Sequence, residues 1–215
     1  MILSSAYAQD INQMDSNGER HGVWKKYFAG TKTLRYEGAF EHGKEVGVFK
    51  FYCQDCKGNP AIVKDFKEDG SAWVQFYAGK KLASEGKMIG KERDGEWVYF
   101  QKKSKDVMTR EFYINGMIEG VVTTYYPNGK ITEETNYLKG LKEGANNYYS
   151  YDGVLLKKLQ YKNDLLQGAA QYFDAKGNVI IEGHYKNGQK HGLWKYYKNG
   201  QLEKEETFPK RNKKN

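Results

Sequence analysis

The sequence predicts an all-β protein: an elongated, single-layer antiparallel meander built from about eight β-hairpin repeats. Two observations lead to this fold class. A glycine recurs at a nearly constant spacing, and the residues between successive glycines form short aromatic and β-branched runs separated by turn dipeptides. A period within about 20 to 50 residues is typical of repeat architectures, in which each unit packs only against its neighbours.

The spacing of the recurring position, here called the mark, is 24 or 25 residues along nearly the whole chain. The marks are Gly22, Gly47, Ser71, Gly95, Gly120, Gly144, Gly168 and Gly192. Five positions after each mark lies an aromatic residue: Tyr27, Tyr52, Phe76, Phe100, Tyr125, Tyr149, Phe173 and Tyr197. The chain therefore contains eight copies of one unit, numbered here from the N-terminus.

Each copy contains a second column of large residues: Phe40, Phe66, Met88, Tyr113, Tyr137, Tyr161, Tyr185 and Phe208. Three residues before this column, five copies carry a glutamate: Glu37, Glu85, Glu134, Glu182 and Glu205. The unit reads G-x-W-x-x-Y, a turn, L-x-x-E-G-x-Y and a second turn. We interpret the repeated glutamates as partners of lysine or arginine on neighbouring strands.

Strands fit these half-units better than helices do. Glycines interrupt each unit too often for a stable amphipathic helix, and the large residues do not recur with a helical period. Dipeptides such as Asn115-Gly116 and Asn187-Gly188 supply the positive φ angles of tight hairpins. Strands joined by short turns pair antiparallel, so two strands per unit predict about sixteen strands in all.

The run E-G-x-aromatic-x-x-G-x-x-x-G occurs from Glu37 to Gly47 and again from Glu182 to Gly192. It resembles the MORN repeat. The Trp-Lys-Tyr-Tyr continuation at Trp194–Tyr197 is similar to the MORN variant of the bacterial YwqK-family antitoxins. The resemblance covers roughly residues 17–208 and implies a non-catalytic module that neutralises a toxin protein by binding it.

We expect three regions: residues 1–16 as a truncated signal-like or flexible N-terminus, 17–208 as one repeat domain, and 209–215 as a basic tail. Ile2, Leu3 and the step Ala6-Tyr7-Ala8 are typical of the end of a secretory signal peptide. They favour an exported or envelope location over a cytoplasmic one. Pro209 and the lysines after it are expected to stop further strand pairing or to form a basic arm.

Cys53 and Cys56 lie in a turn of the second copy, where two alternatives stay open. A local disulfide or two free thiols is the first, and an exported location favours the disulfide. A metal or redox role is the second, but a redox pair normally sits at a helix N-terminus, and zinc needs further ligands. We expect no cofactor and no metal. His21 and His191, which precede marks, are interpreted as turn residues.

The sequence contains no nucleophile elbow, phosphate-binding glycine loop or zinc-protease motif, so we expect neither an enzyme nor a small-molecule substrate. The net charge of +8 is spread among alternating glutamates, which disfavours nucleic acid and leaves weak attraction to acidic membranes or polyanions. A protein partner, such as a toxin, fits better. The alternative is an exported envelope scaffold that binds membrane, glycan or a surface protein.

Trp and Tyr supply most interface hot spots, so exposed members of the aromatic columns are the candidate binding residues. They are Trp24, Trp73, Trp97, Tyr126, Tyr148, Tyr172 and Trp194. Copies five to seven replace the tryptophan of the unit by Val122, Asn146 and Ala170. These small residues predict either a hollow that receives a partner side chain or compensation by neighbouring Tyr148 and Tyr172.

Overall fold

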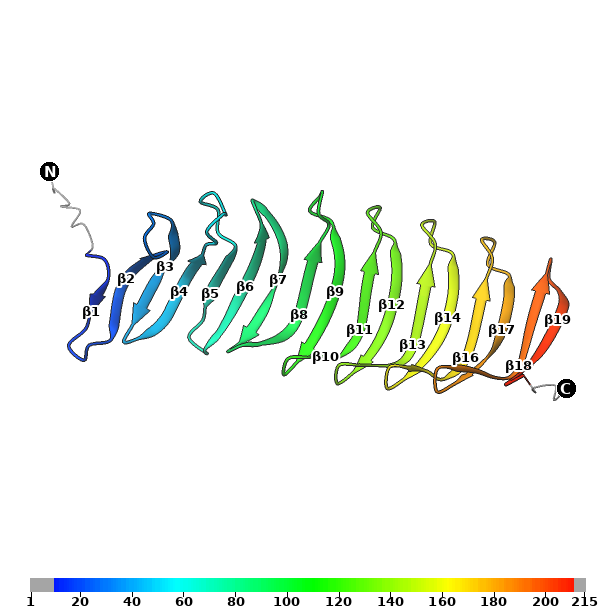
Figure 1. Ribbon diagram of the computed structural model, residues 1–215. Coiled ribbons are helices and arrows are strands. Elements are labelled where there is room, and N and C mark those ends of the chain that lie inside the picture. Colours follow the sequence, from blue (N-terminus) through cyan, green and yellow to red (C-terminus); the bar gives the residue numbers. More distant parts are fainter. Residues whose placement is uncertain (1–9, 211–215) are drawn as a thin grey trace. The chain divides into compact units, whose positions relative to one another are not determined.

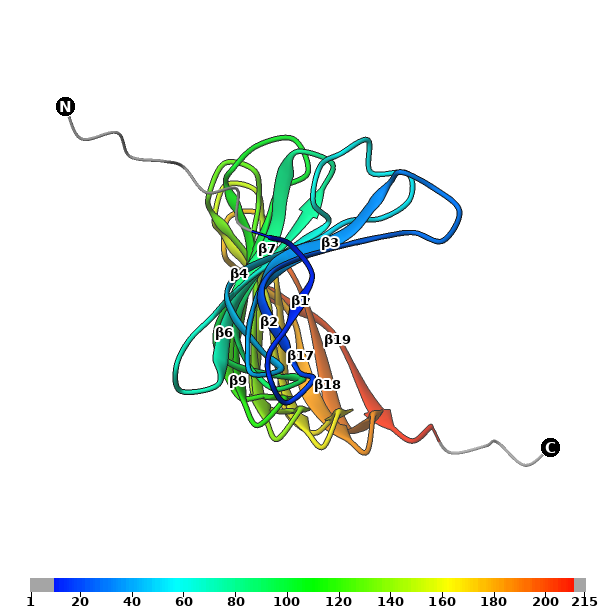
Figure 2. The same ribbon diagram turned by 90° about the vertical axis from the view of Figure 1, so that its left-hand side faces the viewer.

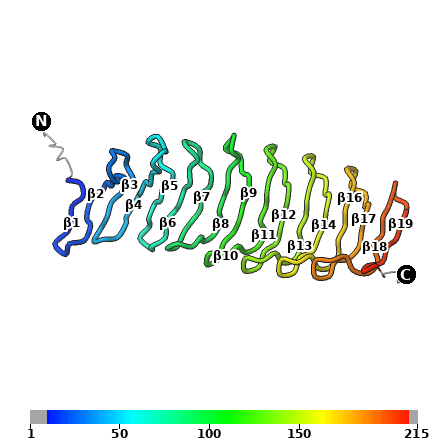
Figure 3. Tube along the Cα trace, in the orientation of Figure 1, coloured from blue at the N-terminus to red at the C-terminus, as the bar shows by residue number. Residues whose placement is uncertain are grey.

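The computed structural model describes residues 10–210, which form nineteen strands and no helix (Figure 1). The all-β prediction is confirmed, and within each of two compact units the successive strands pair antiparallel. The first unit ends at Arg93 and the second begins at Asp94. Within each unit the Cα trace runs along one strand and returns along the next (Figure 3). No helix within residues 10–210 is long and apolar enough to cross a membrane.

The first unit is a meander of hairpins in which each strand pairs with the next. Its strands are β1 (Gln13–Met14), β2 (Arg20–Tyr27), β3 (Leu34–Glu41), β4 (Lys44–Phe51), β5 (Ile62–Phe66), β6 (Ser71–Ala78) and β7 (Lys81–Ile89). The loop between β2 and β3 extends beyond the strands in the turned view (Figure 2). In the loop after β4, Cys53 and Cys56 are joined by a disulfide.

The second unit continues the same hairpin pattern. Its strands are β8 (Glu92–Phe100), which begins just before the boundary, β9 (Val107–Ile114), β10 (Met117–Ile118), β11 (Gly120–Tyr125), β12 (Ile131–Leu138), β13 (Leu141–Tyr149), β14 (Leu155–Lys162), β15 (Leu165–Leu166), β16 (Gly168–Phe173), β17 (Val179–Lys186), β18 (Gln189–Lys198) and β19 (Gln201–Phe208). After β19, the Lys210 ammonium lies 3.2 Å from Glu206 and 5.7 Å from the centre of the Phe208 ring.

Three short strands account for the difference between the sixteen expected strands and the nineteen observed. β1 pairs with β2 ahead of the first copy, while β10 and β15 are the first parts of interrupted strands. The interruptions fall at Glu119 and Gln167, directly before the marks Gly120 and Gly168. Their backbone N–H groups still donate to the preceding strand, to Phe112 O and Gln160 O, each at 2.8 Å.

The marker glycines form bulges in the sheet. All seven have φ between 61° and 96°, a region that glycine enters without steric cost. The register shifts where these bulges interrupt a ladder, for example between Glu182 and His184 on β17. A bulge adds residues to one strand and thereby resets which side chains point to each face.

The third copy departs from the sequence alignment by one residue. In the other copies the mark pairs with the second column, as Gly192 does with Phe208, but here Ala72 instead of Ser71 lies opposite Met88. Ser71 does not adopt positive φ, and β5 and β6 pair in continuous register without a bulge. The assignments of Ser71 as a mark and of Phe76 to the aromatic column were therefore wrong; the equivalent residues are Ala72 and Tyr77.

One sheet face, the packed face, holds nearly all the buried side chains. Its central row takes one residue from each main strand. In the first unit the row is Trp24, Gly38, Phe49, Lys64, Val74 and Gly86. In the second unit it is Trp97, Glu111, Val122, Thr135, Asn146, Leu159, Ala170, Gly183, Trp194 and Glu206. The opposite face is called the open face.

Volumes along the packed row compensate one another. Large rings lie over glycines: a Cβ on Gly38 would sit 2.5 Å from the Phe49 ring, and one on Gly183 would sit 2.5 Å from Cε2 of Trp194. Where a strand carries a small residue in place of the ring, the neighbouring row residue on the preceding strand is larger than glycine. Ala170 is 1% exposed because Leu159, itself 6% exposed, fills the space with Tyr148 and Tyr172 packed alongside.

The same compensation fills the position of Asn146. Asn146 is 0% exposed and Thr135 is 3% exposed. The Asn146 amide donates to Thr135 Oγ1 at 2.6 Å and to Glu133 Oε1 at 2.8 Å. The hollow considered for copies five to seven is therefore absent at Asn146 and Ala170. The expected packing by Tyr148 and Tyr172 is found beside Ala170, whereas Thr135 and Glu133 make the contacts at Asn146.

On the open face, the repeated glutamates bind the tyrosines five positions after the marks. The Tyr52, Tyr149 and Tyr197 hydroxyls donate to Glu37, Glu134 and Glu182, respectively, at 2.7 to 2.8 Å. Glu37 also lies 3.5 Å from Lys25 and 3.9 Å from Lys50, which confirms cross-strand charge pairing in that copy. The tyrosine five positions after a mark and the repeated glutamate of the preceding copy thus form one hydrogen bond, which links neighbouring copies.

Candidate protein-binding surface

The four tryptophans proposed for binding differ in accessibility. Trp97 and Trp194 are 0% exposed, so their rings belong to the core. Trp24 is half-buried; its indole N–H donates to Gln13 O at 3.0 Å, and its ring meets Phe40 edge-on. Trp73 alone among the four is well exposed, at 43%, because the missing bulge of the third copy turns it to the open face. Its indole N–H donates to Glu85 at 3.3 Å.

The three tyrosines proposed for binding are partly buried and already engaged in internal contacts. The Tyr126 hydroxyl donates to Tyr149 O at 3.0 Å, and the Tyr172 hydroxyl lies 3.1 Å from that of Tyr185. Burial, with the neighbouring Glu133, raises the pKa of Tyr148 to about 12. Burial likewise raises the pKa of Tyr172. The rings of Tyr148 and Tyr172 therefore support the packed face, the Tyr126 ring packs against Tyr151, and all three present little surface to a partner.

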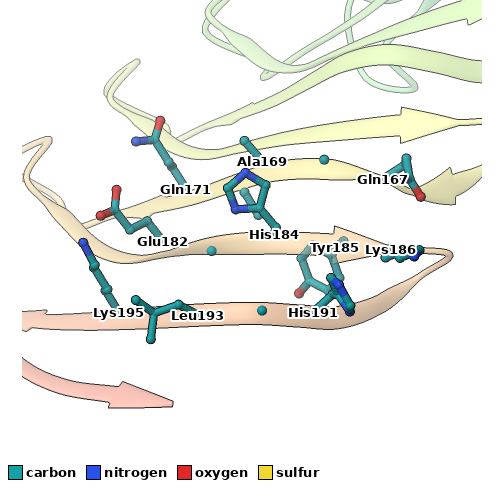
Figure 4. A pocket seen from close by; sticks show the side chains of 14 residues that line it. Gln167, Ala169, Gln171, Glu182, His184, Tyr185, Lys186, His191, Leu193 and Lys195 are labelled. Carbon is teal, nitrogen blue, oxygen red and sulfur yellow. The ribbon is translucent and has the colours of Figure 1, made fainter. Parts of the chain in front are cut away.

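The second unit has a shallow trough of about 710 Å³ on β16, β17 and β18 (Figure 4). Its lining is small along the strands, with Gly168, Ala169, Gly183 and Gly192 among the contributors. Leu193, 46% exposed, is the large apolar side chain of this lining. The small residues leave the trough open because no side chain rises from them to fill it.

Charged and polar side chains line the two ends of the trough. At one end Gln171, Glu182 and Lys195 lie opposite one another on β16, β17 and β18. At the other end the exposed His184 pairs across the strands with His191. The trough thus has an apolar side chain between polar and charged groups at its two ends, an arrangement that matches the apolar centre and polar rim of protein interfaces.

Further apolar side chains lie exposed on the open face of the second unit. Phe112 on β9 is 46% exposed and Val121 on β11 is 48% exposed. Sequence reasoning missed these two and Leu193, because it ranked residues by aromatic type instead of by face. The alternation along each strand gives the signal: with Trp194 and Tyr196 on the packed face, Leu193 and Lys195 point the other way.

Within residues 10–210, one grouping of carboxylate and imidazole side chains is close enough to hold a metal ion. It consists of Asp15, His21 and His42 in the first unit, and none of these residues lines the trough.

Three segments of the chain, residues 118–139, 166–187 and 190–208, match the MORN repeat variant family. The first segment runs from β10 through β12, the second from β15 through β17, and the third covers most of β18 and β19. These segments are therefore similar to MORN-type repeats. MORN repeats are in general non-enzymatic modules that bind proteins or membranes. No curated protein matches the chain.

Proposed function

We propose that the protein is a non-catalytic binding module that holds a partner protein on the open face of its second unit. The observation that carries this proposal is the contrast between the two faces. On the packed face, neighbouring side chains of the central row bury one another. On the open face, Phe112, Val121 and Leu193 are between 46% and 48% exposed. Apolar side chains interspersed with charged groups are typical of surfaces that become buried in a protein complex.

The partner that we propose is a toxin, which the module neutralises by covering it. This assignment follows the resemblance of Trp194–Tyr197 and its neighbouring strands to the repeats of YwqK-family antitoxins. In such a complex the buried Trp194 would hold the sheet together, and Leu193 on the same strand would contact the toxin. Among the tryptophans predicted from the sequence, Trp73 is the exposed candidate in the first unit.

An exported envelope scaffold is the second candidate function. The observation that favours it is the Ala6-Tyr7-Ala8 step, which lies outside the described residues. The net charge of +8 adds weak attraction to acidic membranes, which salt would screen. A scaffold would bind membrane, glycan or a surface protein without neutralising a toxin.

Affinity capture from the native cell, with cell fractionation, separates these functions. A stoichiometric, salt-resistant partner that arrests growth when expressed alone, and is relieved by co-expression of this chain, supports the toxin proposal. Recovery in the envelope fraction without one stoichiometric partner contradicts it and favours the scaffold.

Paired variants then test the surface. Leu193→Glu places a charge in the trough, whereas Leu165→Glu makes the same change at a side chain that is 51% exposed near a hairpin turn. We expect Leu193→Glu to weaken the captured complex at least about tenfold, or about 1.4 kcal/mol, since hot spots exceed this cost. The Leu165 variant should bind normally. Equal affinity of both variants would exclude the trough from the interface.

A further inference from the structure

Three side chains from separate segments of the first unit converge at one point. Asp15 lies in the turn between β1 and β2, His21 on β2, and His42 in the turn between β3 and β4. The two turns lie at the same end of their strands (Figure 1). One potential ligand atom from each residue lies within 4.8 Å of the other two. The His21 and His42 ring centres are 5.1 Å apart.

The turn itself does not require an imidazole at His42. His42 has φ of 45°, and the corresponding turns of later copies place Asn115, Asn163 and Asn187 at φ of 48° to 50°. Asparagine tolerates this left-handed conformation well and is common in such turns. Backbone geometry therefore explains a polar residue with positive φ, but it leaves the choice of histidine unexplained.

The position of His21, directly before a mark, does not require a histidine either. The corresponding residue of the seventh copy is Gln167, and in the eighth copy it is His191. His191 faces His184 across the strands, in a copy without an Asp15-like carboxylate grouped beside the two rings. The first copy is thus distinguished by two histidines and a fixed carboxylate in one place.

Asp15 is held so that one carboxylate oxygen is directed at this cluster. Its Oδ1 accepts the backbone N–H groups of Asn17 and Glu19, each at 2.9 Å. This is ordinary turn chemistry, because Asp174 Oδ1 accepts two backbone N–H groups in the same way. The second oxygen, Oδ2, lies 2.7 Å from Nδ1 of His42. The Asp15 side chain is 9% exposed, so the turn fixes its position.

The surrounding charges favour a cation. The Glu19 carboxylate lies beside Gly43, with Oε2 3.6 Å from the position of a Cβ at that glycine. Glu41 directly precedes His42. The neighbouring cation, Arg20, is engaged elsewhere: its guanidinium carbon lies 5.1 Å from the ring centres of both Trp24 and Phe40.

We propose that Asp15, His21 and His42 bind one borderline transition-metal dication of the zinc or nickel class. Asp15 Oδ2 and one ring nitrogen from each histidine would be the protein ligands, and water would complete the coordination. Imidazole and carboxylate ligands suit these ions, and sites with three protein ligands and an open position are well known for zinc. Ligation through Nδ1 would replace the Asp15–His42 hydrogen bond. A neutral His42 ring would keep its proton on Nε2, whereas a protonated ring would release one proton to water as the metal binds.

The ion would act as a clamp on the first two hairpins. β1 has two residues and pairs with β2. A bond from Asp15 to His42 through the metal would tie the turn after β1 to the turn after β3, across β2. Because metal ions that bind only the folded state stabilise it, occupancy is expected to raise the thermal stability of the first unit. Cys53 and Cys56 form a disulfide and do not compete for the ion.

Zinc binding to the full chain, prepared without a polyhistidine tag and treated with chelator, tests this site. Equilibrium dialysis with metal analysis should give one zinc ion per chain. The variants His42→Asn and His21→Gln use residues that the chain itself places at equivalent positions, so both should keep the wild-type circular dichroism spectrum. Each should weaken zinc binding at least about tenfold, since even residues that only orient a metal ligand typically contribute this much.

His184→Gln is the matched control, because it removes an exposed histidine of the cross-strand pair His184–His191. It should bind zinc like the wild type. At one fixed zinc concentration, zinc should also raise the melting temperature of the wild type and of His184→Gln by more than that of His42→Asn. Wild-type affinity in both the His42 and His21 variants, or loss of binding in the His184 variant alone, would overturn the assignment. Should one variant misfold, the other decides.

Discussion

The contact between Gly183 and Trp194 provides a sharp test of how the repeats hold together. Gly183 does not have positive φ, so alanine is compatible with its backbone. The added Cβ would nevertheless lie 2.5 Å from Cε2 and 2.7 Å from Cγ of Trp194, distances that force the ring or the strand to move. Overpacking of this kind costs about 1 to 3 kcal/mol, and we expect Gly183→Ala to lose about 3 kcal/mol.

A double-mutant cycle isolates the contact. Trp194→Ala removes a ring that is 0% exposed and should cost about 4 kcal/mol. Once the ring is gone, the extra methyl at position 183 meets no clash. The double variant should therefore also lose about 4 kcal/mol, instead of the roughly 7 kcal/mol expected from addition, so that the coupling is about 3 kcal/mol.

Urea unfolding followed by circular dichroism measures these differences, with an unchanged m-value as the check that the unfolding transition is the same. Ala169→Ser, on the exposed open face of the neighbouring strand, serves as the control and should change stability by less than about 0.5 kcal/mol. A wild-type stability for Gly183→Ala, or additive losses in the double variant, would refute the idea that the glycine leaves the space that the Trp194 ring occupies.

Two further predictions concern the tyrosines. Tyr149→Phe removes the 2.8 Å hydrogen bond to Glu134 and should cost about 1 kcal/mol in urea unfolding, while the repeat fold is retained. Burial, with hydrogen bonds to Glu37 and Glu133, raises the pKa of Tyr52 and Tyr148 to about 12. Since a raised pKa favours the neutral form in the folded state, this stabilisation is complete below pH of about 10 and disappears as the pH rises through about 12. After solvent screening we expect about 1 kcal/mol from each tyrosine, measured by urea unfolding across this pH range; a flat profile would contradict the assignment.

The period and the turn dipeptides were sufficient to predict the strands, because glycine at the marks and Asn-Gly in the turns are local requirements of the backbone. The alignment of the third copy was wrong by one residue for the same reason. Ser71 occupies the aligned position of a glycine, but a serine does not form the bulge, so the following residues change face. The sequence around Trp73 does not indicate this change of face, because it depends on the pairing of β5 with β6.

The candidate surface was harder to predict, because aromatic type does not determine which face a side chain occupies. Trp194 and Leu193 are neighbours in the sequence, yet the tryptophan is 0% exposed and the leucine 46%. Ranking by hot-spot propensity selects the tryptophan. Alternation along β18 places the two side chains on opposite faces, and the register of β17 and β18, with Lys195 opposite Glu182, shows which face contacts solvent.

The paired substitutions along the packed row explain how such repeats diverge while they keep one fold. Trp194 over Gly183 and Ala170 beside Leu159 are two solutions to the same volume requirement, so each copy can change only together with the strand before it. The open face carries no comparable steric coupling: Ala169, Leu193 and Phe112 can vary one at a time without disturbing the row. In a protein with nearest-neighbour stability, specificity for a partner can therefore change on the open face while the packed face preserves the sheet.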